Sequence, residues 1–164
     1  MKTCLVGCGG IAAVHGSVLT SGIDTEFVAA ADIKPEKAQS YAENFHTKPY
    51  PSLESMLEAE KPDVLHICTP HYLHVPMAIY SLERNINVFM EKPPAISFDQ
   101  LEELKKAAAK SEAQLGFCYQ NRYNASIRAA KDLIDSGKAG KVLGARAFVT
   151  WCRGAACLLY TSPS

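Results

Sequence analysis

The sequence lacks the features that mark several functional classes. Its 164 residues carry 17 Lys and Arg against 17 Asp and Glu, so the formal net charge is zero and no basic excess is available for nucleic acid or an anionic membrane surface. No apolar run reaches the length of a membrane span, and Gly7, Gly9 and Gly10 interrupt any signal-peptide core. We therefore expect a cytoplasmic protein with no nucleic-acid or membrane partner.

Paired cysteines and clustered metal ligands are missing as well. Six cysteines are present, but no two form a Cys-x-x-Cys pair, and Cys152 and Cys157 are five residues apart. Among the five histidines, His71 and His74 are close, but no cysteine or carboxylate flanks them at a useful spacing. We expect buried free thiols and no metal centre.

The most informative stretch lies at the N-terminus, where an apolar segment runs into a glycine-rich turn. Gly7, Gly9 and Ala12 fit the pattern Gly-x-Gly-x-x-Gly/Ala, which brings a dinucleotide pyrophosphate onto a helix N-terminus. Gly7 allows the tight turn, Gly9 has no Cβ to keep phosphates from the backbone, and Ala12 lets the helix lie close to the strand. The sequence predicts a cofactor-binding turn made of Gly7, Cys8, Gly9, Gly10, Ile11 and Ala12.

A carboxylate follows the second apolar segment. Residues 27–32 are typical of a buried strand that ends at Asp32, about 20 residues past the turn, where a ribose hydroxyl needs an acceptor. A carboxylate at this position accepts hydrogen bonds from the ribose of NAD and repels the 2′-phosphate of NADP. Ile33 follows where NADP would favour a cation, although Lys34 is close. We predict that Asp32 and Ile33 contact the cofactor, and that NAD is preferred to NADP.

Short apolar segments alternate with amphipathic ones along the first 120 residues. The pattern predicts strands at 2–6, 27–32, 63–68, 87–90 and 114–118, and between them helices at about 10–21, from 35, at 52–59, up to about 84 and at 98–110. This alternation predicts an α/β fold, a doubly wound parallel sheet of the Rossmann type. Ligands bind such sheets at the carboxyl ends of the strands, where the turn, Asp32, residues 69–70 and residues 91–94 are expected.

With these elements placed, the sequence resembles the Gfo/Idh/MocA family of nicotinamide-dependent oxidoreductases, which includes inositol and glucose-type dehydrogenases. The matching stretches are residues 7–12, Asp32, Cys68-Thr69-Pro70-x-x-x-His74, Glu91-Lys92-Pro93 and Asn121-Arg122-Tyr123. The resemblance implies a Rossmann domain followed by an α/β domain that carries substrate contacts and an oligomer interface. It also implies hydride transfer between a sugar, polyol or inositol-like carbinol and a nicotinamide cofactor, by a homo-oligomer.

The resemblance also implies roles for single residues. Lys92 would be catalytic, hydrogen-bonding the reacting hydroxyl and helping to move its proton. Glu91 would orient Lys92 or the nicotinamide ribose, and a cis peptide bond before Pro93 or Pro94 would aim Lys92 inward. The implied cofactor contacts in this part of the chain are Thr69, Pro70, His74, Glu91, Lys92 and Arg122.

Structural roles stay open for the same side chains. Glu91 and Lys92 could form a solvated pair at a strand end. Thr69 could cap the next helix, and Arg122 could be a surface cation. His74 could pack beneath the cofactor instead of touching it. Packing roles are expected for His15 and His66.

The match to the family's pattern stops near residue 154. We expect a Rossmann domain at 1–121, the start of a substrate and oligomerisation domain at 122–154, with a helix at 125–136 and a strand at 142–151, and a non-native or disordered tail at 155–164. No residue matches the family's Asp/His partner of Lys92, so we expect an incomplete chain. The two hypotheses are a fragment of an NAD-dependent dehydrogenase and a non-catalytic dinucleotide-binding module or inactive truncation product.

Overall fold

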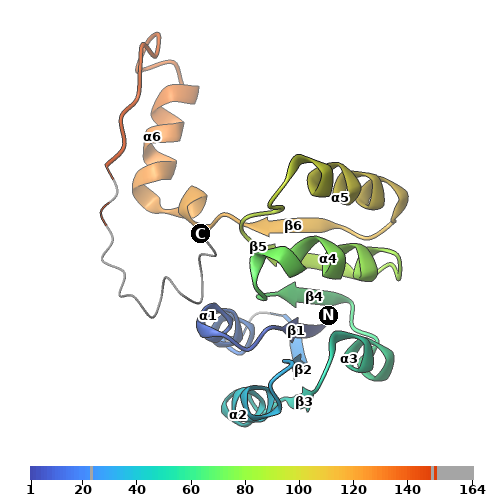
Figure 1. Ribbon diagram of the computed structural model, residues 1–164. Helices are drawn as coiled ribbons and strands as arrows, with labels where there is room; N and C mark the ends of the chain where they lie inside the picture. The colour runs from blue at the N-terminus through green and yellow to red at the C-terminus, as the bar shows by residue number, and fades with distance from the viewer. Residues whose placement is uncertain (23, 149, 151–164) are drawn as a thin grey trace. The chain divides into compact units, whose positions relative to one another are not determined.

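Residues 1–22, 24–148 and 150 are described by a computed structural model, in which the chain divides into two units, Met1–Cys118 and Tyr119–Ser164. The described part of the first unit holds a six-stranded sheet in the order β3-β2-β1-β4-β5-β6, with all neighbouring strands parallel (Figure 1). The strands are β1 Lys2–Val6, β2 Glu26–Ala31, β3 Lys48–Tyr50, β4 Val64–Ile67, β5 Asn87–Glu91 and β6 Leu115–Cys118. The predicted doubly wound α/β fold is confirmed.

Successive side chains of a strand point to opposite faces of the sheet, and helices cover both of these faces. Cys4 and Val6 of β1 belong to the core beneath helices α3, α4 and α5, whereas Leu5 belongs to a smaller core with Ala12 and Tyr41 of helices α1 and α2. The helices are α1 Gly10–Leu19, α2 Pro35–Phe45, α3 Leu53–Glu60, α4 His74–Leu82, which follows a 3-10 turn His71–Leu73, and α5 Phe98–Lys110.

The strand order places a topological switch point at the carboxyl edge of the sheet. The chain proceeds from β1 outward through β2 to β3, and then returns to build β4, β5 and β6 on the other side of β1. The carboxyl ends of β1 and β4 therefore flank the point where the winding direction reverses. Ligands of open α/β sheets bind at such a switch point.

The edge strand β3 is absent from the sequence-based prediction. It has three residues, includes Pro49, and pairs only with the last residues of β2. A strand this short with an internal proline carries almost no periodic signal, and proline is tolerated there because the strand lies at the sheet edge.

The second unit contains helix α6, Ala125–Asp135, which the sequence predicted over 125–136. Gly137 follows it with a φ of +73°, as expected for a glycine that ends a helix. The strand expected at 142–151 is wrong for residues 142–148 and 150, which have no strand conformation. A strand needs a hydrogen-bonded neighbour, and the described residues of this unit include no other strand. The tail expected at 155–164 lies outside the described residues.

The expected burial of the thiols is found for two of the four described cysteines. Cys4 and Cys68 are buried, and Cys8 and Cys118 are half-buried. In the described part of the chain, no helix is both long enough and apolar enough to cross a membrane.

A buried carboxylate, Glu60 at the end of α3, ties together the amino-terminal side of the sheet. Its side chain is only 5% exposed and forms ion pairs of 2.9 Å with both Lys2 and Lys48. The Tyr50 hydroxyl donates a third hydrogen bond at 2.6 Å. Hydrogen bonds from Tyr50, Lys2 and Lys48 lower the pKa of Glu60 to about 2.

Candidate active site

The turn after β1 is closed against the end of β4. Gly7 has a φ of +93°, in the left-handed region that favours glycine, and its N–H donates to the carbonyl oxygen of Ala31 at 2.8 Å. A Cβ on Gly7 would lie 2.7 Å from backbone atoms of Cys68 and Thr69. Glycine is therefore required here both by its φ and by the close contact of two strand ends.

Helix α1 begins at this turn with an uncapped N-terminus. Gly9 is its N-cap residue and offers no side-chain hydrogen bond, and a Cβ on Gly9 or Gly10 would have no atom within 4 Å. Ala12 is fully buried. Farther along the helix, a Cβ on Gly16 would lie 2.5 Å from the Tyr41 hydroxyl. Open space above free backbone N–H groups and the positive end of a helix dipole suits a phosphate group.

An open groove of about 400 Å³ continues from the turn between α1 and α2. Cys8 and Gly9 line it from the turn, and Lys37 and Tyr41 line it from α2. Burial raises the pKa of the Cys8 thiol to about 12, which keeps it protonated. Ile11 is 39% exposed on the first turn of α1. The groove offers room for a group larger than a phosphate beside the turn.

Asp32 is half-buried directly after β2 and holds the turn from the other side. Its Oδ2 accepts from the backbone N–H of Cys8 and its Oδ1 from the backbone N–H of Lys34, both at 2.9 Å. A carboxylate can accept about four hydrogen bonds, so both oxygens keep lone pairs for a ligand hydroxyl. Ile33 is 81% exposed beside it. The geometry fits the acceptor role predicted for Asp32.

Thr69 and Pro70 follow β4 at the switch point. The Thr69 hydroxyl contacts Sδ of Met77 at 3.6 Å, and no side chain caps the 3-10 turn or α4. The alternative in which Thr69 caps the next helix is therefore wrong. Pro70 is exposed at the same edge.

His74 is fully buried and joins two of the strand-end loops. Its Nε2 lies 2.9 Å from the carbonyl oxygen of Thr69, and its Nδ1 lies 2.8 Å from the carbonyl oxygen of Pro93. This position favours the packing role over direct contact, because the side chain holds the loops after β4 and β5 together from beneath.

Glu91 is the last residue of β5 and is also buried, at 5% exposure. Its Oε1 accepts from Nε2 of His15 at 3.0 Å, and its Oε2 lies 3.3 Å from the backbone N–H of Lys92. Burial alone would raise the pKa of this carboxyl, but hydrogen bonds from His15 and Cys118 and the positive charge of Lys92 hold it below its usual value. The alternative of a solvated Glu91 is wrong; the carboxylate fixes the start of the Lys92 loop.

Lys92 itself is exposed at the carboxyl edge of the sheet. The peptide bond between Lys92 and Pro93 is cis, as expected for one of the two prolines. Arg122 belongs to the second unit, where its guanidinium lies 6.0 Å from the ring centre of Tyr119. Its contact with the cofactor stays a prediction.

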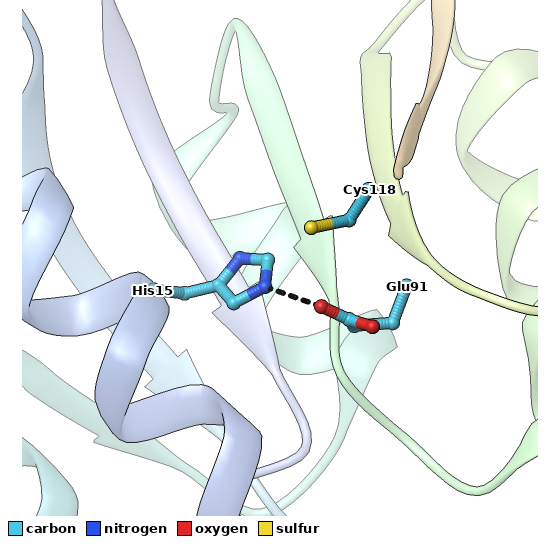
Figure 2. A group of neighbouring side chains, drawn as sticks. All are labelled: His15, Glu91 and Cys118. Carbon is cyan, nitrogen blue, oxygen red and sulfur yellow. Dashed lines mark hydrogen bonds and ion pairs between the residues drawn. The ribbon is translucent and has the colours of Figure 1, made fainter. Parts of the chain in front are cut away.

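A polar cluster that the sequence analysis missed surrounds Glu91. Figure 2 shows the His15 imidazole pointing from α1 toward the Glu91 carboxylate, with the Cys118 thiol directed into the same space from the end of β6. The other ring nitrogen of His15, Nδ1, lies 2.9 Å from Nδ1 of His66, and the Phe89 ring packs against both imidazoles. Burial and the neighbouring His15 lower the pKa of His66 to about 4, so this ring is neutral at pH 7.

Two signals could have located this cluster. On the expected parallel sheet, His66, Glu91 and Cys118 occupy alternating positions that share one face, and the register aligns Glu91 with Cys118. His15 lies one and a half turns into the helix that covers that face. The packing role expected for His15 and His66 is confirmed, but their polar contacts were not foreseen.

Comparison with known proteins identifies a family and several relatives of this chain. A family model named GFO_IDH_MocA, described as an oxidoreductase family with an NAD-binding Rossmann fold, matches residues 1–119. D-glucoside 3-dehydrogenase of Escherichia coli is 28% identical over 144 residues, which are 87% of this chain and 41% of that protein. 2,7-anhydro-N-acetylneuraminate hydratase of Mediterraneibacter gnavus is 30% identical over 146 residues, 87% of this chain and 38% of that protein.

A solved structure with a related sequence is similar along most of the chain. The WlbA dehydrogenase of Bordetella pertussis, in complex with NADH and UDP-GlcNAcA, is 31% identical with a TM-score of 0.82, over 86% of this chain and 44% of that one. The chain thus spans about two fifths of the length of the relatives that it matches.

Proposed function

Since the chain belongs to the Gfo/Idh/MocA family of NAD-binding oxidoreductases, we propose that it is the dinucleotide-binding part of a dehydrogenase. The reaction is hydride transfer between a nicotinamide cofactor and a carbinol of a sugar, polyol or inositol-like substrate. The single observation that carries the proposal is the meeting of four strand ends at one edge of the sheet. There the open helix terminus, Asp32, the Thr69 loop and the Glu91–Lys92 pair all flank the switch point.

Each strand end would take one part of the cofactor. The first turn of α1 would hold the pyrophosphate through backbone N–H groups, and Asp32 would accept from the adenosine ribose. The groove between α1 and α2 supports a nucleoside on that side. Thr69, Pro70 and the Glu91–Lys92 loop would line the nicotinamide half.

NAD is our choice over NADP. Asp32 is already oriented by two backbone N–H groups and keeps acceptor capacity toward the ribose. A 2′-phosphate at this place would meet the carboxylate charge, and the neighbouring Ile33 offers no compensating cation. Lys34 and Lys37 lie near enough in the chain to make this choice worth testing directly.

Lys92 is the proposed catalytic residue, because its amine stands at the exposed edge and its backbone is held by a buried carboxylate. Its ammonium would hydrogen-bond the reacting hydroxyl and help to move its proton, while the bound nicotinamide supplies the hydride acceptor. Glu91 and His74 would position the loop that carries Lys92, from β5 and from α4.

Cofactor binding is tested on the chain itself by titrating NADH and NADPH and following nicotinamide fluorescence. We expect the chain to bind NADH more tightly than NADPH. Asp32→Ala should weaken NADH binding about tenfold, which corresponds to about 1.4 kcal/mol. The same variant should reduce the ratio of NADH affinity to NADPH affinity. Asp99→Ala removes an exposed carboxylate at the start of α5 and serves as the matched control. Tighter binding of NADPH would overturn the NAD choice, and binding of neither would overturn the cofactor site.

Hydride transfer is tested with protein purified from its source, whose intact mass is compared with the 17.8 kDa of this chain. Sugars, polyols and inositols are offered with NAD, and Lys92→Ala is expected to lower turnover by at least about 100-fold while dinucleotide affinity is kept. Lys105→Ala, at an exposed site on α5, is the control. Unchanged turnover in Lys92→Ala would rule out the role of Lys92. Dinucleotide binding without turnover of any substrate would favour the non-catalytic module.

A further inference from the structure

The cluster around Glu91 brings together three different kinds of metal-binding atom. Nε2 of His15, a carboxylate oxygen of Glu91 and Sγ of Cys118 all lie within 4.8 Å of one another (Figure 2). They come from helix α1, strand β5 and strand β6, so the backbone of the core fixes each of them. His15 and Glu91 are buried, and Cys118 is half-buried.

These separations are close to those of a metal site. Zinc bonds to nitrogen, oxygen and sulfur are about 2.0 to 2.3 Å long, so tetrahedral ligands lie roughly 3.3 to 3.8 Å apart. The observed pair of His15 and Glu91 is 3.0 Å apart, and no pair exceeds 4.8 Å. Side-chain adjustments of about 1 Å would place all three around one ion.

The surroundings of His15 match those of a metal-bound imidazole. Such an imidazole almost always donates its second N–H to a neighbouring group, which fixes the ring. Here Nδ1 of His15 faces Nδ1 of His66 at 2.9 Å, and His66 packs in turn against Phe89. The ring of His15 is thus held with Nε2 toward Glu91 and Cys118.

We propose that His15, Glu91 and Cys118 form a binding site for a divalent zinc ion, with water as the fourth ligand. The nitrogen, oxygen and sulfur set is one that zinc accepts and that calcium and magnesium do not favour. Three protein ligands leave the fourth position open. The site goes beyond the proposed dehydrogenase reaction, does not depend on it, and replaces our sequence-based expectation that the chain has no metal centre.

Binding releases the proton of one thiol. The Cys118 thiol lies beside the Glu91 carboxylate, and it would lose its proton to the solvent when the thiolate binds zinc. His15 would bind through an unprotonated Nε2 and carry its proton on Nδ1, where it donates to His66. The proton that Nε2 of His15 now donates to Glu91 would thus leave Nε2, and His66 would carry its own proton on Nε2.

The experiment uses zinc and cobalt ions alone, added to the full chain in the reduced state. Cobalt at this site is expected to give a thiolate-to-metal charge-transfer band in the near ultraviolet and visible bands typical of tetrahedral coordination. Zinc is expected to displace cobalt, to bind at one ion per chain by calorimetry and to raise the melting temperature, because it binds only the folded state. Calorimetry in two buffers of different ionisation enthalpy measures the released proton.

Three variants separate this site from adventitious binding. Cys118→Ser should abolish the charge-transfer band, and His15→Gln should abolish one-to-one zinc binding. His66→Phe, which removes only the support of His15, should weaken zinc binding about 10-fold or more. Cys8→Ser, together with replacement of Cys152 and Cys157 by serine, should leave the band unchanged and serves as the control.

The possible results divide cleanly. A band that persists in Cys118→Ser, or that disappears in the Cys8, Cys152 and Cys157 control, would overturn the proposal. The same conclusion follows if the wild-type chain binds no zinc, and the cluster would then be a hydrogen-bonded network only. Circular dichroism tests whether each variant is folded. If Cys118→Ser does not fold, His15→Gln supplies an independent result.

Discussion

Two buried glutamates, one at each end of the parallel sheet, are held in different ways. Glu60 near the amino ends of β1 and β3 is surrounded by two ammonium groups and a phenol, all drawn in from side chains with exposed portions. Glu91 at the carboxyl end of β5 is held by an imidazole and a thiol that come from the interior. The first arrangement surrounds the carboxylate with ammonium groups, whereas the second surrounds it with side chains that can also bind metals.

The two clusters therefore differ in role: the side chains around Glu60 support the fold, whereas those around Glu91 can also take part in chemistry. The partners of Glu60 are two lysines and a tyrosine, which hold it in a structural role. The donors of Glu91 are a histidine and a cysteine, which bind metals and exchange protons. The contrast leads to four predictions, beginning with the variant that should cost most.

Removing His15 should destabilise the fold most. His15→Ala leaves Glu91 and His66 buried without their shared partner, and it opens a cavity beside Phe89. We expect the free energy of unfolding to fall by about 3 kcal/mol, measured by urea denaturation. Val14→Ala, at a 58% exposed neighbour on the same helix, is the control and should change little. A loss for His15→Ala no greater than that of the control would show that the cluster contributes no stability.

Removing Glu60 should cost less. Glu60→Ala strands the Tyr50 hydroxyl, but Lys48 is 68% exposed and can be hydrated by water. We expect a loss of about 2 kcal/mol in the same denaturation assay, and a smaller loss for Glu60→Gln, which keeps a hydrogen bond to Tyr50. If Glu60→Ala cost more than His15→Ala, the amino-terminal cluster would be the stronger of the two.

Acid should weaken the Glu60 cluster in a defined range. Its pKa of about 2 in the folded protein lies below the ordinary value of 4.5, so the folded state favours the charged carboxylate. This contribution is complete above pH 4.5 and is lost as the pH falls toward 2. Because its partner Lys48 is 68% exposed and solvent screens that attraction, we expect a loss of about 1–2 kcal/mol. The stability difference between wild type and Glu60→Gln, measured from pH 7 to pH 3, should shrink accordingly; a difference that stays constant would contradict the assignment.

The smallest effect is expected for a single exposed cation. Lys48→Met should lower stability by about 0.5 kcal/mol or less at low salt, and by less still at high salt, because its ammonium is largely hydrated. Lys105→Met breaks the exposed pair with Glu102 and serves as the reference. A loss for Lys48→Met well above that of Lys105→Met, and insensitive to salt, would show that Glu60 needs both lysines.

Local chemistry made much of the fold and of the cofactor edge predictable. Gly7, Asp32 and Pro35 were predictable because their residue types meet local requirements: a positive φ at Gly7, a carboxylate directly after a strand at Asp32, and a fixed φ at the first residue of α2. Ser97 caps α5, because its hydroxyl accepts from the N–H of Gln100, and the Gln100 side chain accepts in turn from the N–H of Ile96.

The unpredicted features depend on distant partners. The register of the expected sheet could have aligned Glu91 with Cys118, but the contact of both with His15 depends on how α1 packs against the sheet. Gly16 likewise reads as an ordinary helix residue until Tyr41 of α2 is placed against it. The strand expected at 142–151 as the start of a second domain needs a pairing neighbour, which the described residues of this unit do not supply.

Helix α1 connects the glycine turn with the side chains around Glu91. One stiff rod of ten residues carries the anion-attracting terminus at Gly9 and, farther along, the imidazole that reaches Glu91 beside Lys92. A helix transmits an axial shift along its whole length, so a ligand that draws its first turn outward also moves His15. The ring resonances of His15 can therefore serve as a reporter, more than a helical turn away, of what is bound at the glycine turn.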